Sequence, residues 1–312
     1  MQGGDGMPRR SPGRRPKQPS TASLLVEAAL LSRVGLRIVQ VGANLGDFDR
    51  SHHTRLARDD PVREAMLRLL EADATHAVLV EANPPVHAAL QEGLRRSASA
   101  QRHATANVAV CTQARSGTAH FYTVLQDRLL RDFPQAPRWA RSELSSLDSR
   151  SVLAGVGLVV GRENASRYVG ALDVPCLTPS DLLRNVSIPP SALDVLVVDA
   201  EGSDVGIVQA FFDAAARPRL IFFEIDTARY HEKAQTRKLL AQLVRSGYHV
   251  YCCGCGGYFP PGFRKKGEAD DKRCDAARNA FAWDPAALGM ATVLHSGKFE
   301  WGGGGRRRGD VA

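Results

Sequence analysis

The 312-residue sequence has no apolar run close to the roughly 18 residues that a membrane-spanning helix needs. The early stretch Leu24 to Leu31 is too short and contains Glu27, so it predicts an amphipathic helix leading into the first strand. Aromatic residues are also scarce, at 6% of the chain, which leaves few rings on which a flipped base could stack. The sequence therefore predicts no transmembrane segment and weighs against an enzyme that acts on nucleic-acid bases.

The middle of the chain has almost no net charge. Residues 1–22 carry +4 and residues 302–312 carry +2 of the formal +8, and both ends are rich in Gly and Arg. Such segments cannot build a core, so we expect a disordered basic arm at 1–22, a folded domain at 23–301 and a disordered Gly/Arg tail at 302–312. Nucleic-acid binders carry their basic residues on a folded face, so no stable nucleic-acid partner is expected.

The N-terminus lacks an apolar region directly behind its basic residues, which argues against a secretory signal. A cytoplasmic location is expected, and organellar targeting by the basic N-terminus stays open. The sequons at Asn164 and Asn185 are then expected to stay unmodified.

Six cysteines in a chain of this size and expected location need not pair. Cys252 and Cys255 form a single C-x-x-C, with Cys274 further on. A four-ligand zinc site would need a second pair of ligands, or a histidine such as His249 or His231. A glycine-rich turn with buried thiols is the favoured interpretation.

Short apolar runs alternate with segments of helical periodicity. Strands are predicted at Leu36 to Val41, Ala77 to Val80, Ala104 to Cys111, Thr118 to Val124, Leu193 to Val198, Leu220 to Phe223 and Tyr248 to Cys252, with Phe281 to Trp283 and Thr292 to Leu294 as candidates for the last. Helices are predicted at Pro61 to Ala72, Pro85 to Leu94, Ser180 to Leu183, Val205 to Ala215 and Lys233 to Ser246. This alternation predicts an α/β fold, a doubly wound, mostly parallel sheet with helices on both faces.

One segment fits the alternation poorly. Phe133 to Arg162 is described by its sequence as polar, with Pro134 and Pro137, and belongs to an insertion at about residues 125–170. In a doubly wound domain such an insertion is expected to cover the carboxyl ends of the strands.

The first predicted strand runs directly into a glycine turn, Val41-Gly42-Ala43-Asn44-Leu45-Gly46. Glycine there lets the backbone approach a ligand closely, so Val41, Gly42, Ala43, Asn44 and Gly46 are candidate cofactor contacts. A dinucleotide-binding loop has the spacing G-x-G-x-x-G, and Asn44 stands where its second glycine is needed. The spacing therefore counts against a pyrophosphate ligand and a nicotinamide-dependent oxidoreductase.

Carboxylates end three of the predicted strands. Glu81 ends the second, where an acid can accept hydrogen bonds from ribose hydroxyls; a helix-capping role before Asn83 is the alternative. Asp199 and Glu201 follow Leu193 to Val198, and Glu224 ends the next strand. These acids could bind a ligand or serve as a base; three carboxylates could also bind a metal, but spacing alone does not indicate one, so none is assigned.

Several short motifs occur in a characteristic order. They are IVQVGANLGDF from Ile38, LVEANP from Leu79, NVAV from Asn107, SSL from Ser145, VPCLTPSDLL from Val174, LDVLVVDAEGSD from Leu193, PRLIFFEI from Pro218 and SGYHVY from Ser246. This ordered set resembles the FkbM family of S-adenosylmethionine-dependent methyltransferases over about Arg37 to Tyr251.

The resemblance implies a class I methyltransferase (Rossmann-like) sheet of seven strands and O-methylation of a hydroxyl on a sugar, polyketide or similar metabolite. It places Gly42, Asn44 and Gly46 at the methionine part of the cofactor. Glu81 would hold the ribose and Asn107 would lie near the adenine, and Asn83 is a further candidate cofactor contact. Asp199 and Glu201 would face the transferred methyl group.

The chain departs from the family pattern in two places. Ala200 and Ser203 stand where Val and Ala are more usual, which is a conservative change. Cys252 to Arg273 is unusually rich in Cys, Gly and Pro, which leaves the substrate side open.

Methyl transfer to a neutral hydroxyl needs a base or a nearby charge. Asp199 is the first candidate for this base, followed by Glu201, Glu224 and His231. For His231 the alternative is a structural hydrogen bond.

Asn83-Pro84-Pro85 resembles the motif of amino-methylating enzymes, but Val86 stands where an aromatic is needed. A non-catalytic binding or scaffold protein that retains the fold is the remaining alternative.

Overall fold

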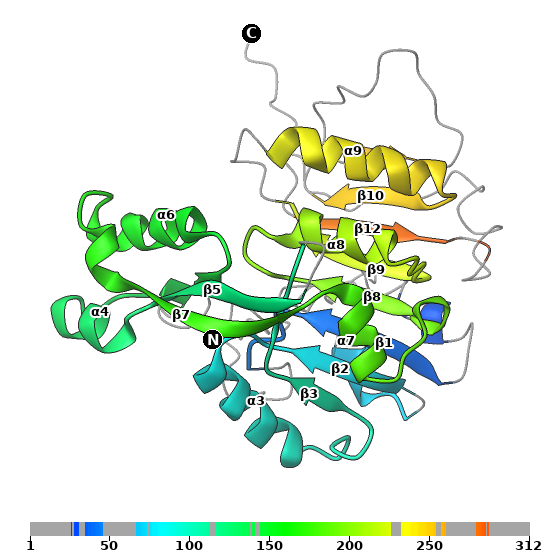
Figure 1. Cartoon of the computed structure of the whole chain (residues 1–312), viewed down its shortest axis with the longest axis horizontal. Coiled ribbons are helices and arrows are strands. Elements are labelled where there is room, and N and C mark those ends of the chain that lie inside the picture. The colour runs from blue at the N-terminus through cyan, green and yellow to red at the C-terminus, as the bar shows by residue number, and fades with distance from the viewer. Residues whose placement is uncertain are drawn as a thin grey trace, which may run out of the picture.

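The computed structural model describes residues 26, 28–30, 35–45, 67–73, 75–112, 116–137, 139–140, 144–225, 232–253, 257–259, 279–284 and 286. Its main feature is a sheet of eight described strands in the order β11-β10-β12-β9-β8-β1-β2-β3 (Figure 1). Five of them are parallel neighbours: β3 (Ala104–Ala106), β2 (Thr75–Val80), β1 (Leu36–Val41), β8 (Val195–Val198) and β9 (Leu220–Glu224).

The far end of the sheet is antiparallel. There β12 (Asn279–Trp283) lies between β9 and β10 (His249–Cys253), and β11 (Gly257–Phe259) pairs with β10 at the edge. The predicted α/β class is confirmed, but the sheet is mixed rather than a seven-stranded, mostly parallel one. The last strand returns antiparallel, and a short hairpin strand adds an eighth member. The candidate strand Thr292 to Leu294 lies outside the described residues.

Apolar side chains cover both faces of the sheet, which explains why the central strands are continuously hydrophobic. On one face Val39 and Val41 pack with residues of α7 (Pro179–Asn185), α8 (Asp204–Asp213) and α9 (Glu232–Arg245). On the other face Leu36 and Ile38 pack with Leu90 of α3 (Pro84–Arg95) and with Leu69 of the helical residues 67–71. Helices on both faces are therefore confirmed.

A second sheet of four strands lies beside the main one, in the order β4-β7-β5-β6. It consists of β4 (Ala109–Val110), β5 (Gly117–Val124), β6 (Ser145–Ser146) and β7 (Val169–Leu177). The predicted strand Ala104 to Cys111 is thus two strands in two sheets, because the chain leaves the main sheet at Asn107. The side-chain amide of Asn107 donates to the carbonyls of Glu81 (2.8 Å) and Ala82 (3.2 Å).

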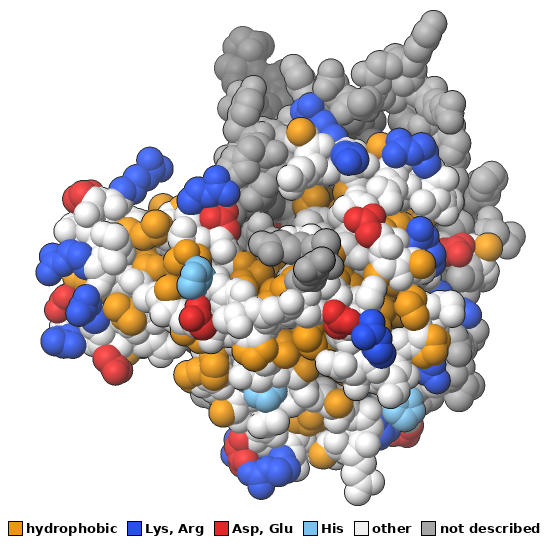
Figure 2. All heavy atoms as spheres, viewed as in Figure 1, with side chains coloured by type: hydrophobic (Ala, Val, Ile, Leu, Met, Phe, Trp, Pro, Cys, Tyr) orange, Lys and Arg blue, Asp and Glu red, His pale blue; other side chains and the backbone are white. Residues whose placement is uncertain are grey.

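Residues 117–177, called the arm below, extend away from the main sheet (Figure 1). The arm carries α4 (Gln126–Asp132), α6 (Ser149–Val160) and the short helix η3 (Ala165–Tyr168) around its own apolar core. The description of Phe133 to Arg162 as polar is corrected, because Val152, Val156 and Val160 are spaced for one buried face of α6. Lys and Arg side chains stand out at the outer end of the arm in Figure 2.

Two cysteines join β4 to β7. Cys111 and Cys176 form a disulfide with their Cα atoms 5.4 Å apart, and both are buried in a small cluster with Phe121 and Val174. The expectation that the cysteines need not pair is therefore wrong for these two. Cys252 and Cys253 lie in β10, and Cys255 and Cys274 fall outside the described residues. No helix in the described ranges is both long and apolar enough to cross a membrane.

Candidate functional site

An open pocket lies at the carboxyl ends of β1, β2 and β8. Its floor is formed by strand-end residues of the main sheet, including Val41, Glu81 and Asp199, and one wall is formed by the arm. The order of the strands explains the position, because the loops after adjacent parallel strands emerge at the same edge.

Gly42 is required by the protein's own backbone. Its φ is +77°, and a Cβ at this position would lie 1.7 Å from the carbonyl oxygen of Asp199. The N–H groups of Gly42 and Ala43 both donate to the carbonyl of Val80, at 2.9 and 3.0 Å. The glycine therefore lets the turn after β1 pack between the ends of β2 and β8. Of the predicted cofactor contacts in this turn, Val41, Gly42 and Asn44 line the pocket, whereas Ala43 does not.

Glu81 is 7% exposed, yet its carboxylate reaches the pocket. Oε1 accepts the backbone N–H of Asn83 and Oε2 accepts that of Asn44, both at 2.8 Å. Burial raises the pKa of Glu81 above its usual range, and nearby Asp199 adds to the rise, while the backbone donors oppose it. Asn44 supplies its N–H from a left-handed conformation, φ +50°, that Asn adopts more readily than most residues.

The turn after β8 is also held in a special conformation. Glu201 has φ +50° and Gly202 has φ +101°. The carboxylate of Asp204 fastens the turn, because its two oxygens accept the N–H groups of Ala200 and Gly202, each at 3.0 Å. Burial, with Asp199 and Glu224 nearby, raises the pKa of Asp204 to about 8.

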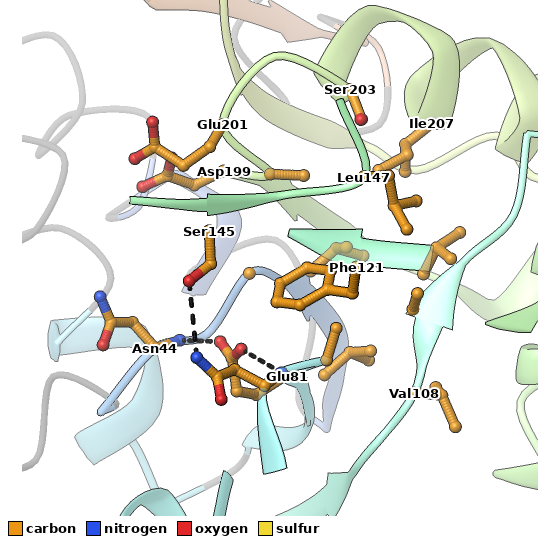
Figure 3. A pocket seen from close by; sticks show the side chains of 18 of the residues that line it. Asn44, Glu81, Val108, Phe121, Ser145, Leu147, Asp199, Glu201, Ser203 and Ile207 are labelled. Atoms are coloured by element: carbon orange, nitrogen blue, oxygen red, sulfur yellow. Dashed lines mark hydrogen bonds between the residues drawn. The ribbon is translucent and has the colours of Figure 1, made fainter. Parts of the chain in front are cut away.

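Three of the predicted catalytic residues lie together. One carboxylate oxygen from each of Asp199, Glu201 and Glu224 lies within 4.8 Å of the others. This geometry could hold a metal ion, though grouped acids are also common without one. Asp199 and Glu201 line the pocket, and in Figure 3 they lie across it from Glu81 and Asn44. The parallel pairing of β8 with β9 brings Glu224 beside them.

The other predicted site residues differ in their position relative to the pocket. Asn83 is 6% exposed and lines the pocket. Asn107 is not among the lining residues, since its side chain is occupied by the carbonyls after β2; Val108 and Ala109 line the pocket instead. Gly46 and His231 lie outside the described residues.

Several residues at or near the pocket were not predicted as site residues from the sequence. Phe121, Ser145 and Leu147 of the arm line the pocket, and Asp204 supports the turn after β8. The alternation of Thr118 to Val124 predicted a strand but not its position at the pocket. An acid two residues after Gly202, at the start of a helix, was the available signal for Asp204.

The fold and the pocket define an α/β protein with an open pocket at the carboxyl edge of a mixed sheet. Residues 40–250 match the model of the methyltransferase FkbM domain. The chain belongs to the FkbM methyltransferase family, which supports methyl transfer as its general reaction and confirms the suspected resemblance.

No curated protein matches the chain. Among solved structures, the crystal structure of cofactor-bound Rv0187 from MTB is similar at 12% identity, covering 87% of this chain and 84% of that chain with a TM-score of 0.36. That similarity is too low to support an argument about the site.

Proposed function

We propose that this protein is an S-adenosylmethionine-dependent methyltransferase that O-methylates a hydroxyl on a sugar or other small metabolite. The observation that carries the proposal is the buried carboxylate of Glu81, which faces the pocket while two backbone N–H groups hold it. Each carboxylate oxygen has a further lone pair available beyond the bond it accepts from the backbone. Glu81 can therefore accept hydrogen bonds from two neighbouring hydroxyls, which is what a ribose offers.

The charge of the pocket supports S-adenosylmethionine as its ligand. Glu81, Asp199 and Glu201 line it, and the described lining residues include no Lys or Arg. Such a lining disfavours a pyrophosphate and favours a ligand with cationic groups, because opposite charges attract strongly where water is partly excluded. S-adenosylmethionine carries two cationic groups and one carboxylate. The lining therefore weighs against a nicotinamide dinucleotide.

The residues across the pocket from Glu81 fit the acceptor. Bound S-adenosylmethionine would supply an electrophilic methyl group. Asp199 and Glu201 lie where a carboxylate could accept the proton that the acceptor hydroxyl loses. Glu224 adds negative charge beside them. This charge makes it easier for Asp199 or Glu201 to take up the proton of the acceptor hydroxyl. The chain would thus orient the acceptor oxygen and hold its proton.

Calorimetric titration of S-adenosylmethionine into the full chain tests the cofactor assignment. We expect micromolar binding that Glu81→Gln weakens about 10- to 100-fold, the effect of losing hydrogen bonds to a charged group. Glu92→Gln on α3 is the matched control, because it makes the same change at a partly exposed residue that does not line the pocket. NADH serves as the competing ligand.

The result also decides between the enzyme and the scaffold alternative. Binding that depends on Glu81 justifies a labelled-methyl screen of sugars and other hydroxyl compounds, in which Asp199→Asn should lower kcat by about 10²- to 10⁴-fold. A folded wild-type chain that binds no S-adenosylmethionine would refute the cofactor assignment and favour a non-catalytic protein.

The cytoplasmic or organellar location remains a prediction. The disulfide between Cys111 and Cys176 weighs against a reducing compartment, because disulfides persist mainly in oxidising ones. Cell fractionation with a tagged chain would distinguish these locations.

A further inference from the structure

The arm meets the pocket through a short pairing of two strands. β6 pairs with β5 so that Ser145 lies opposite Thr123. Ser145 and the nearby Phe121 line the pocket, whereas Thr123 does not. The helices α4 and α6 lie further out along the arm (Figure 1). Among the described residues of the arm, Phe121, Ser145 and Leu147 line the pocket, so the arm meets it through β5, β6 and the residue just after β6.

Three polar side chains join the pairing to the loop after β2. The hydroxyls of Thr123 and Ser145 share a hydrogen bond of 3.0 Å. Nδ2 of Asn83 donates to Oγ1 of Thr123 at 3.3 Å and, with a longer contact of 3.5 Å, to Oγ of Ser145. Asn83, Thr123 and Ser145 are called the latch below.

Asn83 connects the latch to the acid in the pocket. Its side chain contacts the arm, and its backbone N–H donates to Oε1 of Glu81. That N–H orients the carboxylate together with the backbone N–H of Asn44, and the backbone of Ala82 also contributes a hydrogen bond. A displacement of the arm would therefore displace a group that holds Glu81.

The position of Asn83 on α3 supports a role beyond helix formation. Asn83 is the N-cap residue, where an Asn side chain commonly caps the helix, but here it makes no capping hydrogen bond. Pro84 and Pro85 follow it and have no N–H groups, so fewer donors at this helix start need a partner. The side chain is thereby left for the arm.

We propose that the latch is a positioning device, through which the β5–β6 pairing sets the orientation of Glu81 and makes the arm part of the cofactor site. Thr123 and Ser145 are then positioning residues that act through Asn83. The inference rests on the proposed function, because it assigns a role in binding the same cofactor.

Thr123→Val is the sharpest test, because Thr123 does not line the pocket and Val keeps a similar shape while removing the hydroxyl. We expect affinity for S-adenosylmethionine to fall about tenfold, as the loss of one partly buried hydrogen-bonding partner implies. Thr123→Ser should restore it, since the hydroxyl returns. Thr118→Val is the matched control, an exposed position on the same strand. Hydrogen exchange at the amides of Asn44 and Asn83 gives a second readout that needs no ligand.

The outcomes separate this inference from the proposed function. If the wild type binds the cofactor and Thr123→Val binds it equally well, the latch has no positioning role. If the wild type binds none, the proposed function fails and hydrogen exchange decides alone. Faster exchange at the two amides in Thr123→Val, but not in Thr118→Val, would then support the latch, and equal exchange would overturn it.

Discussion

At the scale of single residues, the site depends on a few positions whose backbone or charge is unusual. Gly42 and Gly202 have left-handed backbones at the ends of β1 and β8, and so do Asn44 and Glu201. Glu81 and Asp204 are buried acids that accept backbone hydrogen bonds from these turns. The buried carboxylates thus accept backbone N–H groups of these turns, which make no hydrogen bond within a helix or strand.

Gly42→Ala should be among the most damaging single substitutions. The new Cβ would overlap the backbone carbonyl of Asp199, which cannot move without shifting β8. We expect a loss of about 2–4 kcal/mol in the free energy of unfolding, measured by urea titration, from overpacking and a left-handed Ala. Gly247→Ala is the control, because Gly247 also has a positive φ but nothing lies within 4 Å of its Cβ position. Equal losses in both variants would contradict this account.

Asp204 should make the protein less stable as pH rises. Its pKa is raised from 3.8 to about 8 in the folded chain, so the folded state keeps a proton that the unfolded state has lost. Stability therefore falls between about pH 4 and pH 8, by at most about 1.4 kcal/mol per pH unit. Asp204→Asn, which does not titrate, should show a flatter dependence in urea unfolding from pH 4.5 to 8.5. The same slope in both proteins would show that other groups cause it.

At the scale of elements, the arm is attached to the main sheet by β4 and β7. These strands pair in parallel at Ala109 and Val110, and the disulfide between Cys111 and Cys176 lies directly beside that pairing. The bond spans a sequence separation of 65 residues, which includes most of the arm. The base of the arm is therefore covalently closed, and the latch lies between this base and the helices further out.

Loss of the disulfide should destabilise the protein. A bond that closes a loop of this length restricts the unfolded chain, and removing one commonly costs about 2–5 kcal/mol. We expect a loss of this size in the double variant Cys111→Ala/Cys176→Ala, measured by urea unfolding. A reducing agent should lower the stability of the wild type by a similar amount and leave the double variant unchanged. A wild type that is insensitive to reduction would contradict the prediction.

At the scale of the whole molecule, the pocket is assembled from segments far apart in the sequence. The turn after β1, the loop after β2, the β5–β6 pairing and the turn after β8 all contribute lining residues. The main sheet brings three of these segments to one edge, and the arm brings the fourth. No single segment of the chain contains the site.

The basic ends should contribute little to the site. Residues 1–22 and 302–312 account for +6 of the net charge of +8 and are expected from composition to lie outside the folded domain. We expect a chain limited to residues 23–301 to bind S-adenosylmethionine within about twofold of the full chain, because surface charges are screened beyond about 10 Å in 0.1 M salt. Calorimetry on both chains measures this. A large loss of affinity would assign the ends a direct role in binding.

The sequence by itself determined the α/β class, most of the strands and the acids that end them. Continuous apolar strands such as Val195–Val198 predict burial on both faces, and a glycine or an acid directly after a strand is a local signal. The family resemblance, confirmed over residues 40–250, was also readable from ordered short motifs.

Only the tertiary structure decided which of these residues meet. The antiparallel return of β12, the pairing of Cys111 with Cys176 and the arrival of Ser145 beside Asn83 depend on contacts between distant segments. Sequence patterns record the neighbours of a residue along the chain and whether it is buried, but not which distant strand lies beside it. For that reason the strand-end acids could be predicted, whereas the wall that the arm forms around them could not.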